Sequence, residues 1–354
     1  MKMILRWFPH NDDSVTLTQI AQTPCITGVA TCLPKIPVGE VWPLETLKAL
    51  KEEINGAGLE MEVIESVNIH EDIKKGLPSR DEYIQNYIDT IKNLSETGVR
   101  CLCYNFMPVM DWVRSDLAHR LPDGSYVLSY RHENLAEMTP LSMADSMLDK
   151  AEGFSLPGWE PDRFDQMAAD IMFYQDVSEE MYWDNIRYFL EAVIPVAEAW
   201  DVRMAIHPDD PPWSLFGLPK LINNAENIRR FLSIYDSPYN GLTLCSGSLG
   251  ADANNDVAAM AAEFANRINF AHLRNLKRVS TYDFDESAHP SRCGDLDMFE
   301  IVKALYDGGF DAYVRPDHGR MIWGEVARPG YGLYDRALGA CYLLGLWEAV
   351  SKMA

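Results

Sequence analysis

Short apolar runs recur along the chain, and each ends in or beside a cluster of polar or ionisable residues. Runs of this length, bounded by turn-forming residues, are typical of buried β-strands. Eight runs meet this description, at residues 3–7, 28–32, 61–66, 101–106, 202–207, 241–245, 268–272 and 312–315. The pattern therefore predicts eight strands spread over the whole chain.

Helical patterns separate these runs. The clearest one, at residues 80–97, has an apolar face with i, i+3, i+4, i+7 spacing, formed by Ile84, Tyr87, Ile88 and Ile91. Further helices are predicted at residues 44–55, 178–200, 224–235, 254–266, 296–306 and 335–352. Strands that alternate with helices are expected to be parallel, because parallel neighbours need crossover connections.

This alternation predicts an α/β fold, a closed (β/α)8 barrel of the TIM type, with residues 1–354 as a single domain. Barrels of roughly 200 to over 400 residues form one domain when their loops are enlarged, so the chain length is suitable. An open doubly wound sheet is the alternative. It is less favoured, because the first strand is not followed by the G-x-G-x-x-G signature of the commonest dinucleotide-binding version.

The connection after the fourth predicted strand is too long for a single helix. Residues 107–200 number 94, whereas a helix with its loops takes roughly a third of that length. We therefore predict an insertion at residues 107–178. Because it leaves the carboxyl end of a strand, we expect it near the active face or at a subunit interface.

The composition limits the partners and the compartment. The chain has 31 Lys and Arg against 53 Asp and Glu, a net charge of −22, which repels nucleic acid and anionic lipid. Seven cysteines, without the density of a disulfide scaffold, fit free thiols in a reducing compartment. With no secretory signal and no long apolar span in view, we expect a cytoplasmic homo-oligomer that binds neither nucleic acid nor membrane.

The last four predicted strands end in residues of the types that bind metals. His207 ends the fifth strand, Cys245 the sixth and His272 the seventh, and Asp317 follows the eighth. The carboxyl ends of barrel strands carry the active site, and neighbouring strands lie about 4.8 Å apart. These four side chains can therefore converge on one ion. Two imidazoles, a thiolate and a carboxylate suit Mn, Fe, Co or Zn better than Mg or Ca.

Each of these residues also has a structural interpretation. A single strand-end histidine is more often hydrogen-bonded than metal-bound, a lone cysteine is often a core residue, and Asp317 could cap a turn. The occurrence of ligand types at four successive strand ends is what favours the metal. A second metal at His289 and Cys293 is a weaker hypothesis, because this pair lies in a loop without further partners.

At these motifs the chain resembles the mannonate dehydratase family, and the resemblance spans nearly the whole sequence. The matching segments are RWF at 6–8, IPVGEVWP at 36–43, ES at 65–66 with His70, YNF at 104–106, HPDDPP at 207–212, CSGS at 245–248, HLRN at 272–275, DHG at 317–319 and RPGY at 328–331. The combination is far more specific than any one segment. Residues of the insertion are not carried over.

The resemblance implies a xylose isomerase-like barrel that dehydrates D-mannonate to 2-keto-3-deoxy-D-gluconate, with Mn²⁺ or Fe²⁺ as the usual metal. Removal of the C2 proton builds an enediolate, whose charge a metal can stabilise, and the C3 hydroxyl then leaves with a proton from a general acid. The implied metal ligands are His207, Cys245, His272 and Asp317.

The resemblance also suggests roles for other residues. His318 and Tyr331 are the implied proton-transfer pair, and which of the two is the base stays open. Asp317 is implied to be catalytic as well as a metal ligand. Substrate-binding residues are expected at Arg6, His70, Asn105 and Arg274, with the two arginines as carboxylate anchors.

These roles have simpler alternatives. Tyr331 could be a packed aromatic, with Tyr334 as its rival, and His318 could only orient a ligand. Arg6 and Arg274 could form structural ion pairs in an acidic protein.

Three other functions compete with dehydration. A metal-dependent sugar isomerase of related barrel architecture would form a ketose without loss of water, usually from a site richer in carboxylates. A metal-dependent phosphoesterase commonly needs two metals. A sugar-acid binding protein would leave mannonate unchanged.

Overall fold

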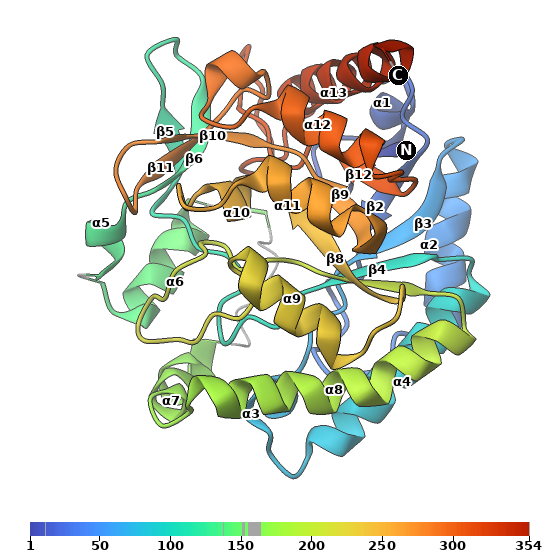
Figure 1. The fold of residues 1–354 in the computed structure, drawn as a ribbon, viewed down its shortest axis with the longest axis vertical. Coiled ribbons are helices and arrows are strands. Elements are labelled where there is room, and N and C mark those ends of the chain that lie inside the picture. The colour runs from blue at the N-terminus through green and yellow to red at the C-terminus, as the bar shows by residue number, and fades with distance from the viewer. Residues whose placement is uncertain (11, 137, 151–152, 155–163, 354) are drawn as a thin grey trace.

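The computed structural model describes residues 1–354 apart from 11, 137, 151–152, 155–163 and 354. The barrel strands in this part of the chain are β1 (Lys2–Arg6), β2 (Gly28–Thr31), β3 (Glu60–Glu65), β4 (Cys101–Tyr104), β7 (Arg203–Ile206), β8 (Asn240–Cys245), β9 (Ile268–His272) and β12 (Tyr313–Arg315). They pair in parallel and close in the order β1-β12-β9-β8-β7-β4-β3-β2 (Figure 1). The predicted closed barrel is confirmed, and the open sheet is excluded.

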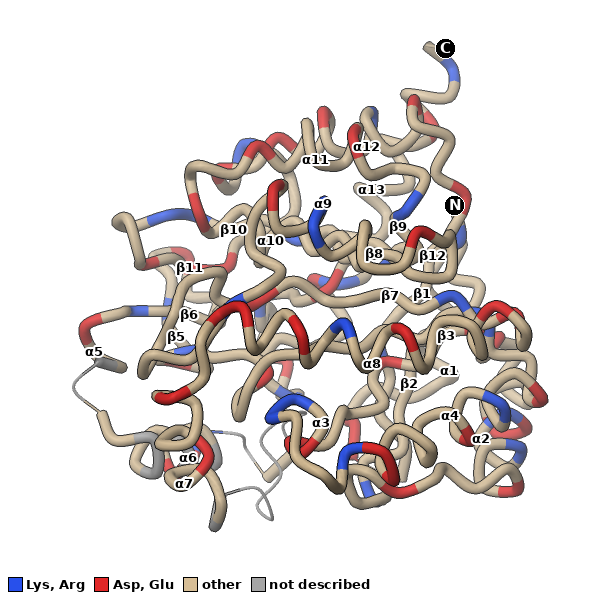
Figure 2. The backbone as a smooth tube through the Cα atoms, turned by 60° about the horizontal axis from the view of Figure 1, so that its bottom comes forward, with Lys and Arg blue, Asp and Glu red and all other residues tan. Residues whose placement is uncertain are grey.

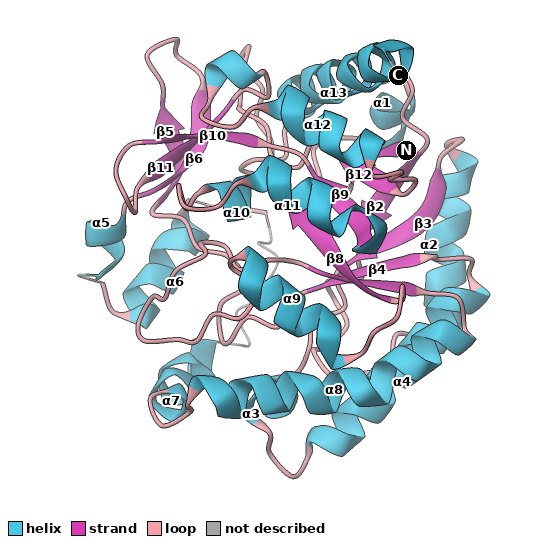
Figure 3. Cartoon of the chain, in the orientation of Figure 1, coloured by secondary structure: helices cyan, strands magenta, loops and turns pink. Residues whose placement is uncertain are grey.

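Helices surround the strands, which gather at the centre of Figure 3. The helices are α1 (Leu17–Ala21), α2 (Leu44–Gly56), α3 (Glu71–Lys75), α4 (Arg80–Glu96), α5 (His132–Ala136), α6 (Pro140–Asp149), α7 (Phe164–Tyr174), α8 (Glu179–Ala199), α9 (Ala225–Ile234), α10 (Ser246–Gly250), α11 (Val257–Phe264), α12 (Met298–Asp307) and α13 (Leu333–Met353), with short 3₁₀ turns η2 (Ala265–Arg267) and η3 (Ser291–Cys293).

Most of the predicted helices are found close to their predicted ranges, and capping residues explain where they begin. Ser178 accepts a hydrogen bond from the Met181 amide at the start of α8. The helix predicted at residues 254–266 is shorter than expected. The Asp256 side chain accepts from the Ala259 amide, so α11 begins only after this cap.

The alternation of side chains along the barrel strands determines which residues reach the mouth of the barrel. A buried apolar cluster fills the interior, formed by Ile4, Ala30, Val63, Cys101, Cys103, Ala205, Phe270 and Tyr313. Side chains two positions apart in a strand share a face. Two positions after the last clustered residue of each strand, nearer the carboxyl-terminal end, the chain has Arg6, Cys32, Glu65, Asn105, His207, His272 and Arg315.

A second sheet lies beside the barrel mouth. Its strands in the described part are β5 (Asp116–Arg120), β6 (Tyr126–Tyr130), β10 (Asn275–Arg278) and β11 (Phe284–Ser287), paired antiparallel in the order β10-β11-β6-β5. Two excursions build it, one after β4 and one after β9, and they meet where β11 pairs with β6 (Figure 1). The excursion after β4 falls in the predicted insertion. The bounds of that insertion and the single-domain assignment stay predictions.

Acidic and basic residues are interspersed along the backbone in Figure 2. Within the ranges that the structure describes, no helix has the length and apolar content needed to cross a membrane.

Candidate metal centre and active site

Three of the predicted metal ligands meet at the carboxyl-terminal mouth of the barrel. One donor atom each of His207, Cys245 and His272 lies within 4.8 Å of the others. Asp317 joins them, with Oδ2 at 3.5 Å from the Cys245 sulfur and Oδ1 at 3.9 Å from His272 Nδ1. The structure thus brings together four side chains, one directly after β7, one at the end of β8, one at the end of β9 and one in the loop after β12.

Local hydrogen bonds aim the donor atoms of two of these residues. The Pro208 carbonyl lies 2.7 Å from His207 Nδ1. A carbonyl can only accept, so Nδ1 carries the proton and Nε2 keeps its lone pair. Burial lowers the pKa of His207, which keeps the ring neutral at pH 7. The Ser248 amide and hydroxyl lie 3.4 and 3.0 Å from the Cys245 sulfur and hold it in place.

Asp317 is held as a carboxylate by two arginines. Arg315 Nη1 lies 2.7 Å from its Oδ1, and Arg274 Nε donates to its Oδ2 at 2.7 Å. Burial alone would raise the pKa of Asp317, but Arg315 and its cationic neighbours hold it well below the usual range. The backbone of Asp317 is left-handed, with φ of 61°. His289 supports this loop by donating from Nε2 to the Pro316 carbonyl at 2.6 Å.

Another group of potential ligands, Glu65, Cys103 and His272, overlaps the first because it shares His272. It is the weaker site, because it offers three donors, whereas Asp317 joins the first group as a fourth. Burial also raises the pKa of the Cys103 thiol well above its usual value, which opposes the thiolate form.

The donor chemistry at the barrel mouth fits a transition metal. The His207, Cys245, His272 and Asp317 set offers nitrogen, sulfur and oxygen donors, which suits Mn, Fe, Co or Zn. In addition, His272 is fully buried between the two groups of potential ligands, with Nδ1 3.9 Å from Asp317 Oδ1 and Nε2 3.5 Å from Glu65 Oε2.

Beside this centre, His318 lies between a carboxylate and a phenol. Its Nδ1 lies 2.9 and 3.1 Å from the two oxygens of Glu286, and its Nε2 lies 3.2 Å from the Tyr331 hydroxyl. Burial opposes ionisation of Glu286, yet His318 and the arginines around it lower its pKa to about 2. Since this carboxylate only accepts, Nδ1 carries a proton and Nε2 faces Tyr331.

Tyr331 complements this basic nitrogen. Burial raises its pKa to about 12, so the phenol keeps its proton at neutral pH and donates toward His318 Nε2. Its rival Tyr334 is 44% exposed, whereas Tyr331 is 8% exposed. The geometry favours Tyr331 as the partner of His318.

The other predicted site residues lie in different surroundings. Arg274 is 1% exposed and contacts Asp210, Glu286 and Asp317, so the geometry favours a role in positioning these carboxylates. Asn105 accepts from the Met107 amide at 3.3 Å. Whether Arg274 and Asn105 touch the substrate stays a prediction.

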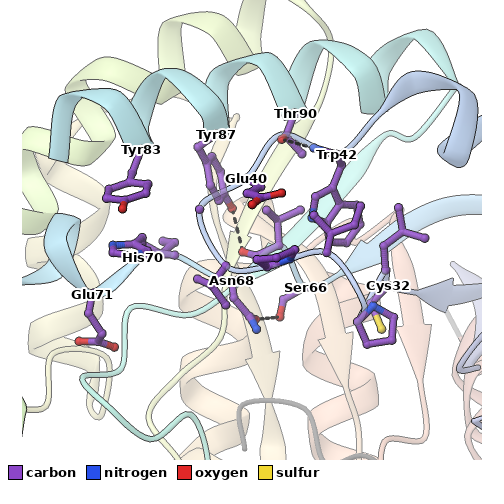
Figure 4. Close-up of a pocket in the computed structure, with 18 of the residues that line it drawn as sticks. Cys32, Glu40, Trp42, Ser66, Asn68, His70, Glu71, Tyr83, Tyr87 and Thr90 are labelled. Carbon is purple, nitrogen blue, oxygen red and sulfur yellow. Dashed lines mark hydrogen bonds between the residues drawn. The ribbon is translucent and has the colours of Figure 1, made fainter. Parts of the chain in front are cut away.

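A cavity of about 880 Å³ opens above β1, β2 and β3. His70 lies in its wall, stacked on Tyr83 with ring centres 3.6 Å apart (Figure 4). At the barrel end the cavity reaches Arg6, whose buried Nη1 lacks a hydrogen-bond partner within the described ranges. Phe8 also lines it and contacts the Tyr331 ring at 5.1 Å. The cavity therefore adjoins the His318–Tyr331 pair.

Sequence reasoning missed several residues of this site. Glu65 and Arg315 pair with each other across the barrel mouth, and Arg114 and Glu286 form a buried ion pair beside it. The first two could have been found, since each lies two positions beyond an inward apolar residue. Arg114 and Glu286 lie in loops and in the second sheet, where no such periodicity extends.

The low pKa of Glu286 predicts a loss of stability in acid. A carboxyl whose pKa falls on folding stabilises the protein above its unfolded pKa, and this contribution disappears as the pH drops through the folded pKa. Between pH 4.5 and about 2, at about 1.4 kcal/mol per pH unit, Glu286 should contribute roughly 3 kcal/mol.

Urea unfolding over this pH range checks that prediction. The free energy of unfolding of Glu286→Gln should depend less steeply on pH than that of the wild type. Equal slopes for the two proteins would contradict the assignment of a low pKa to Glu286.

Comparison with known proteins gives a consistent result over the full length. Residues 1–354 match the family model described as D-mannonate dehydratase (UxuA). A mannonate dehydratase from Thermotoga neapolitana is 57% identical, covering 100% of this chain and 99% of that protein. One from Geobacillus thermodenitrificans is 53% identical, covering 99% of this chain and 95% of that protein.

Solved structures agree with the sequence relatives. The crystal structure of mannonate dehydratase from Streptococcus suis serotype 2 matches with a TM-score of 0.91 at 46% identity, covering 100% of this chain and 95% of that one. A xylose isomerase-like TIM barrel protein from Mycobacterium smegmatis matches with a TM-score of 0.56 at 12% identity, covering 99% and 97% of the two chains. That second likeness extends to the fold alone.

Proposed function

The chain belongs to the mannonate dehydratase family and is a hydro-lyase, and we propose that it removes water from D-mannonate at one Mn²⁺ or Fe²⁺ ion. The proposed ligands are His207, Cys245, His272 and Asp317. The main support for this proposal is that the four side chains come from separate stretches of sequence and meet at the barrel mouth. The donor atoms of the first three lie within 4.8 Å of one another. A metal in this position supplies a Lewis acid for charge that develops beside the substrate carboxylate.

We propose that His318 Nε2 takes the C2 proton. Glu286 keeps the proton on Nδ1, so Nε2 is the basic atom of the ring. Tyr331, which stays protonated at neutral pH, donates a hydrogen bond toward the same region and is the proposed acid for the departing C3 hydroxyl. The 3.2 Å contact between the two groups allows a proton to pass between them after each turnover.

The substrate carboxylate is proposed to bind Arg6. This guanidinium lies at the carboxyl end of β1, lines the cavity and keeps one nitrogen without a partner in the described structure. Guanidinium pairs with carboxylate through two parallel hydrogen bonds, which would fix the orientation of C2. His70, farther along the cavity wall, is the proposed contact for a distal hydroxyl. A cytoplasmic, homo-oligomeric state also stays a prediction.

Product analysis tests the proposed reaction. Protein reconstituted with Mn²⁺ should convert D-mannonate to a 2-keto-3-deoxy acid, and treatment with EDTA should abolish turnover until metal is restored. Product formation is measured by mass spectrometry, because dehydration lowers the substrate mass by one water. A ketose of unchanged mass would instead indicate an isomerase, and bound but unaltered mannonate would indicate a binding protein.

A further inference from the structure

A buried cluster of charges connects the second sheet with the barrel mouth. Its members are 5% exposed or less: Arg114, Asp210, Arg274, Glu286 and Asp317. Removing charged groups from water costs several kcal/mol for each ion unless its partners satisfy it. Such a cluster is therefore unfavourable for stability unless its geometry is closely matched, and it fixes the relative positions of the segments that carry it.

Arg114 is the member that comes from the predicted insertion. Its Nη1 and Nη2 donate to the two oxygens of Asp210, each at 2.9 Å, in a bidentate pair. Nη2 also donates to Glu286 Oε1 at 2.8 Å, and Nε lies 3.2 Å from the same oxygen. One guanidinium thus ties Glu286 to the loop that follows the metal ligand His207.

Glu286 in turn contacts the proposed base. Both of its oxygens lie within 3.1 Å of His318 Nδ1. Arg114 and Arg274 approach Glu286 Oε1 at 2.8 and 3.2 Å, so two buried guanidinium groups hold this carboxylate in place. A carboxylate fixed in this way sets which ring nitrogen of His318 carries the proton, and it keeps the ring facing Tyr331.

We propose that Glu286 is a positioning residue for His318, and that Arg114 holds Glu286 in place for this task. The inference rests on the proposed function, in which His318 takes a proton from the substrate. It assigns a role to the insertion and to the second sheet, because each supplies one half of the Arg114–Glu286 pair. Neither residue needs to touch the substrate.

The chain contains a matched control on the same strand. Asp285 is the neighbour of Glu286 on β11, and side chains of adjacent strand residues point to opposite faces. Asp285 also pairs with an arginine, since Arg131 Nη2 donates to its Oδ1 at 2.7 Å. No contact of Asp285 with His318 is found in the described part of the chain. Asp285→Asn therefore removes a similar charge from the same strand without affecting the proposed base.

The test compares Glu286→Gln with Asp285→Asn in the metal-loaded full-length enzyme. An amide can donate to Nδ1, so Glu286→Gln allows the wrong tautomer of His318. We expect its kcat to fall about 100-fold, with KM and metal content close to wild type. The kinetic isotope effect with C2-deuterated mannonate should increase, because proton removal becomes slower. Asp285→Asn should keep the wild-type kcat and isotope effect.

Conservative variants extend the test. Glu286→Asp keeps an accept-only carboxylate and should recover part of the lost kcat. Arg114→Lys keeps the charge but cannot bridge two carboxylates with a planar fork, so we expect about a 10-fold loss of kcat. Arg131→Lys is its control and should be unaffected. If Glu286→Gln does not fold, the comparison of Arg114→Lys with Arg131→Lys tests the positioning role.

The outcomes separate this inference from the proposed function. If Glu286→Gln folds and keeps the wild-type kcat and isotope effect, or if Arg114→Lys matches Arg131→Lys, the positioning role is wrong. The assignment of His318 as base is tested independently by His318→Asn. If Glu286→Gln has wild-type kinetics and His318→Asn is inactive, the inference is rejected and the proposed function stands.

Discussion

Replacing Cys245 by Ser is expected to lower kcat/KM at least about 100-fold and to leave the purified protein with little bound metal. Mutation of residues that only support metal ligands lowers metal affinity or activity about 10- to 100-fold, so the loss of a thiolate ligand should have a larger effect. The buried sulfur lies in the group with His207 and His272, and Asp317 is 3.5 Å away. Metal content is measured by inductively coupled plasma mass spectrometry alongside steady-state kinetics.

Cys103→Ser is the matched control for this experiment. Cys103 is also a buried thiol of the barrel interior, and it belongs to the competing group with Glu65 and His272. We expect normal metal content and activity for this variant. If Cys103→Ser loses its metal and Cys245→Ser does not, the metal binds to the competing group instead.

Replacing His318 by Asn is expected to lower kcat about 10²- to 10⁴-fold, the usual contribution of a general acid or base. Metal content and substrate affinity should change little, because His318 is not among the proposed ligands or anchors. Tyr331→Phe removes the hydroxyl that lies 3.2 Å from His318 Nε2 and should also impair kcat. Binding is measured by calorimetry and turnover by product formation.

The exposed Tyr334 supplies the control for the phenol. Tyr334→Phe removes a hydroxyl only three positions along the chain, from a side chain that is 44% exposed, and should leave kcat unchanged. If Tyr331→Phe and Tyr334→Phe lower kcat equally, the loss comes from a disturbed loop and not from impaired proton transfer.

The barrel could be predicted from sequence because its strands are buried throughout. Strands such as β8 and β9 are buried at every position, so they stand out as apolar runs bounded by polar residues. The second sheet is different. β5 has a single buried residue, Leu117, and β11 pairs with β6, which lies about 150 residues earlier in the chain. A local pattern contains no information about such distant pairing.

A local signal for part of that sheet does exist. Asp123 and Gly124 form the turn between β5 and β6, where Gly124 has φ of 88°, a conformation that favours glycine. An Asp-Gly pair is a turn signal, and here it precedes the apolar stretch of β6. It could have predicted the turn, but not the pairing of this hairpin with β11.

For the proposed metal ligands Cys245 and Asp317, the signal was the residue type at or just after a strand end. His207 and His272 each lie two positions after an inward apolar residue, Ala205 and Phe270, so the sequence places them on the same face as the core. Glu65 obeys the same rule after Val63. The position of Glu286 follows from tertiary pairing in the second sheet, which is why His318 could be proposed from sequence while its carboxylate partner could not.

The most direct test is an anomalous-difference map from crystals loaded with Mn²⁺, recorded at the manganese absorption edge. We expect one strong peak for each chain, within bonding distance, about 2.0 to 2.4 Å, of donor atoms of His207, Cys245, His272 and Asp317. A peak bound by Glu65 and Cys103, or a fully loaded crystal with no density among the four predicted side chains, would contradict it.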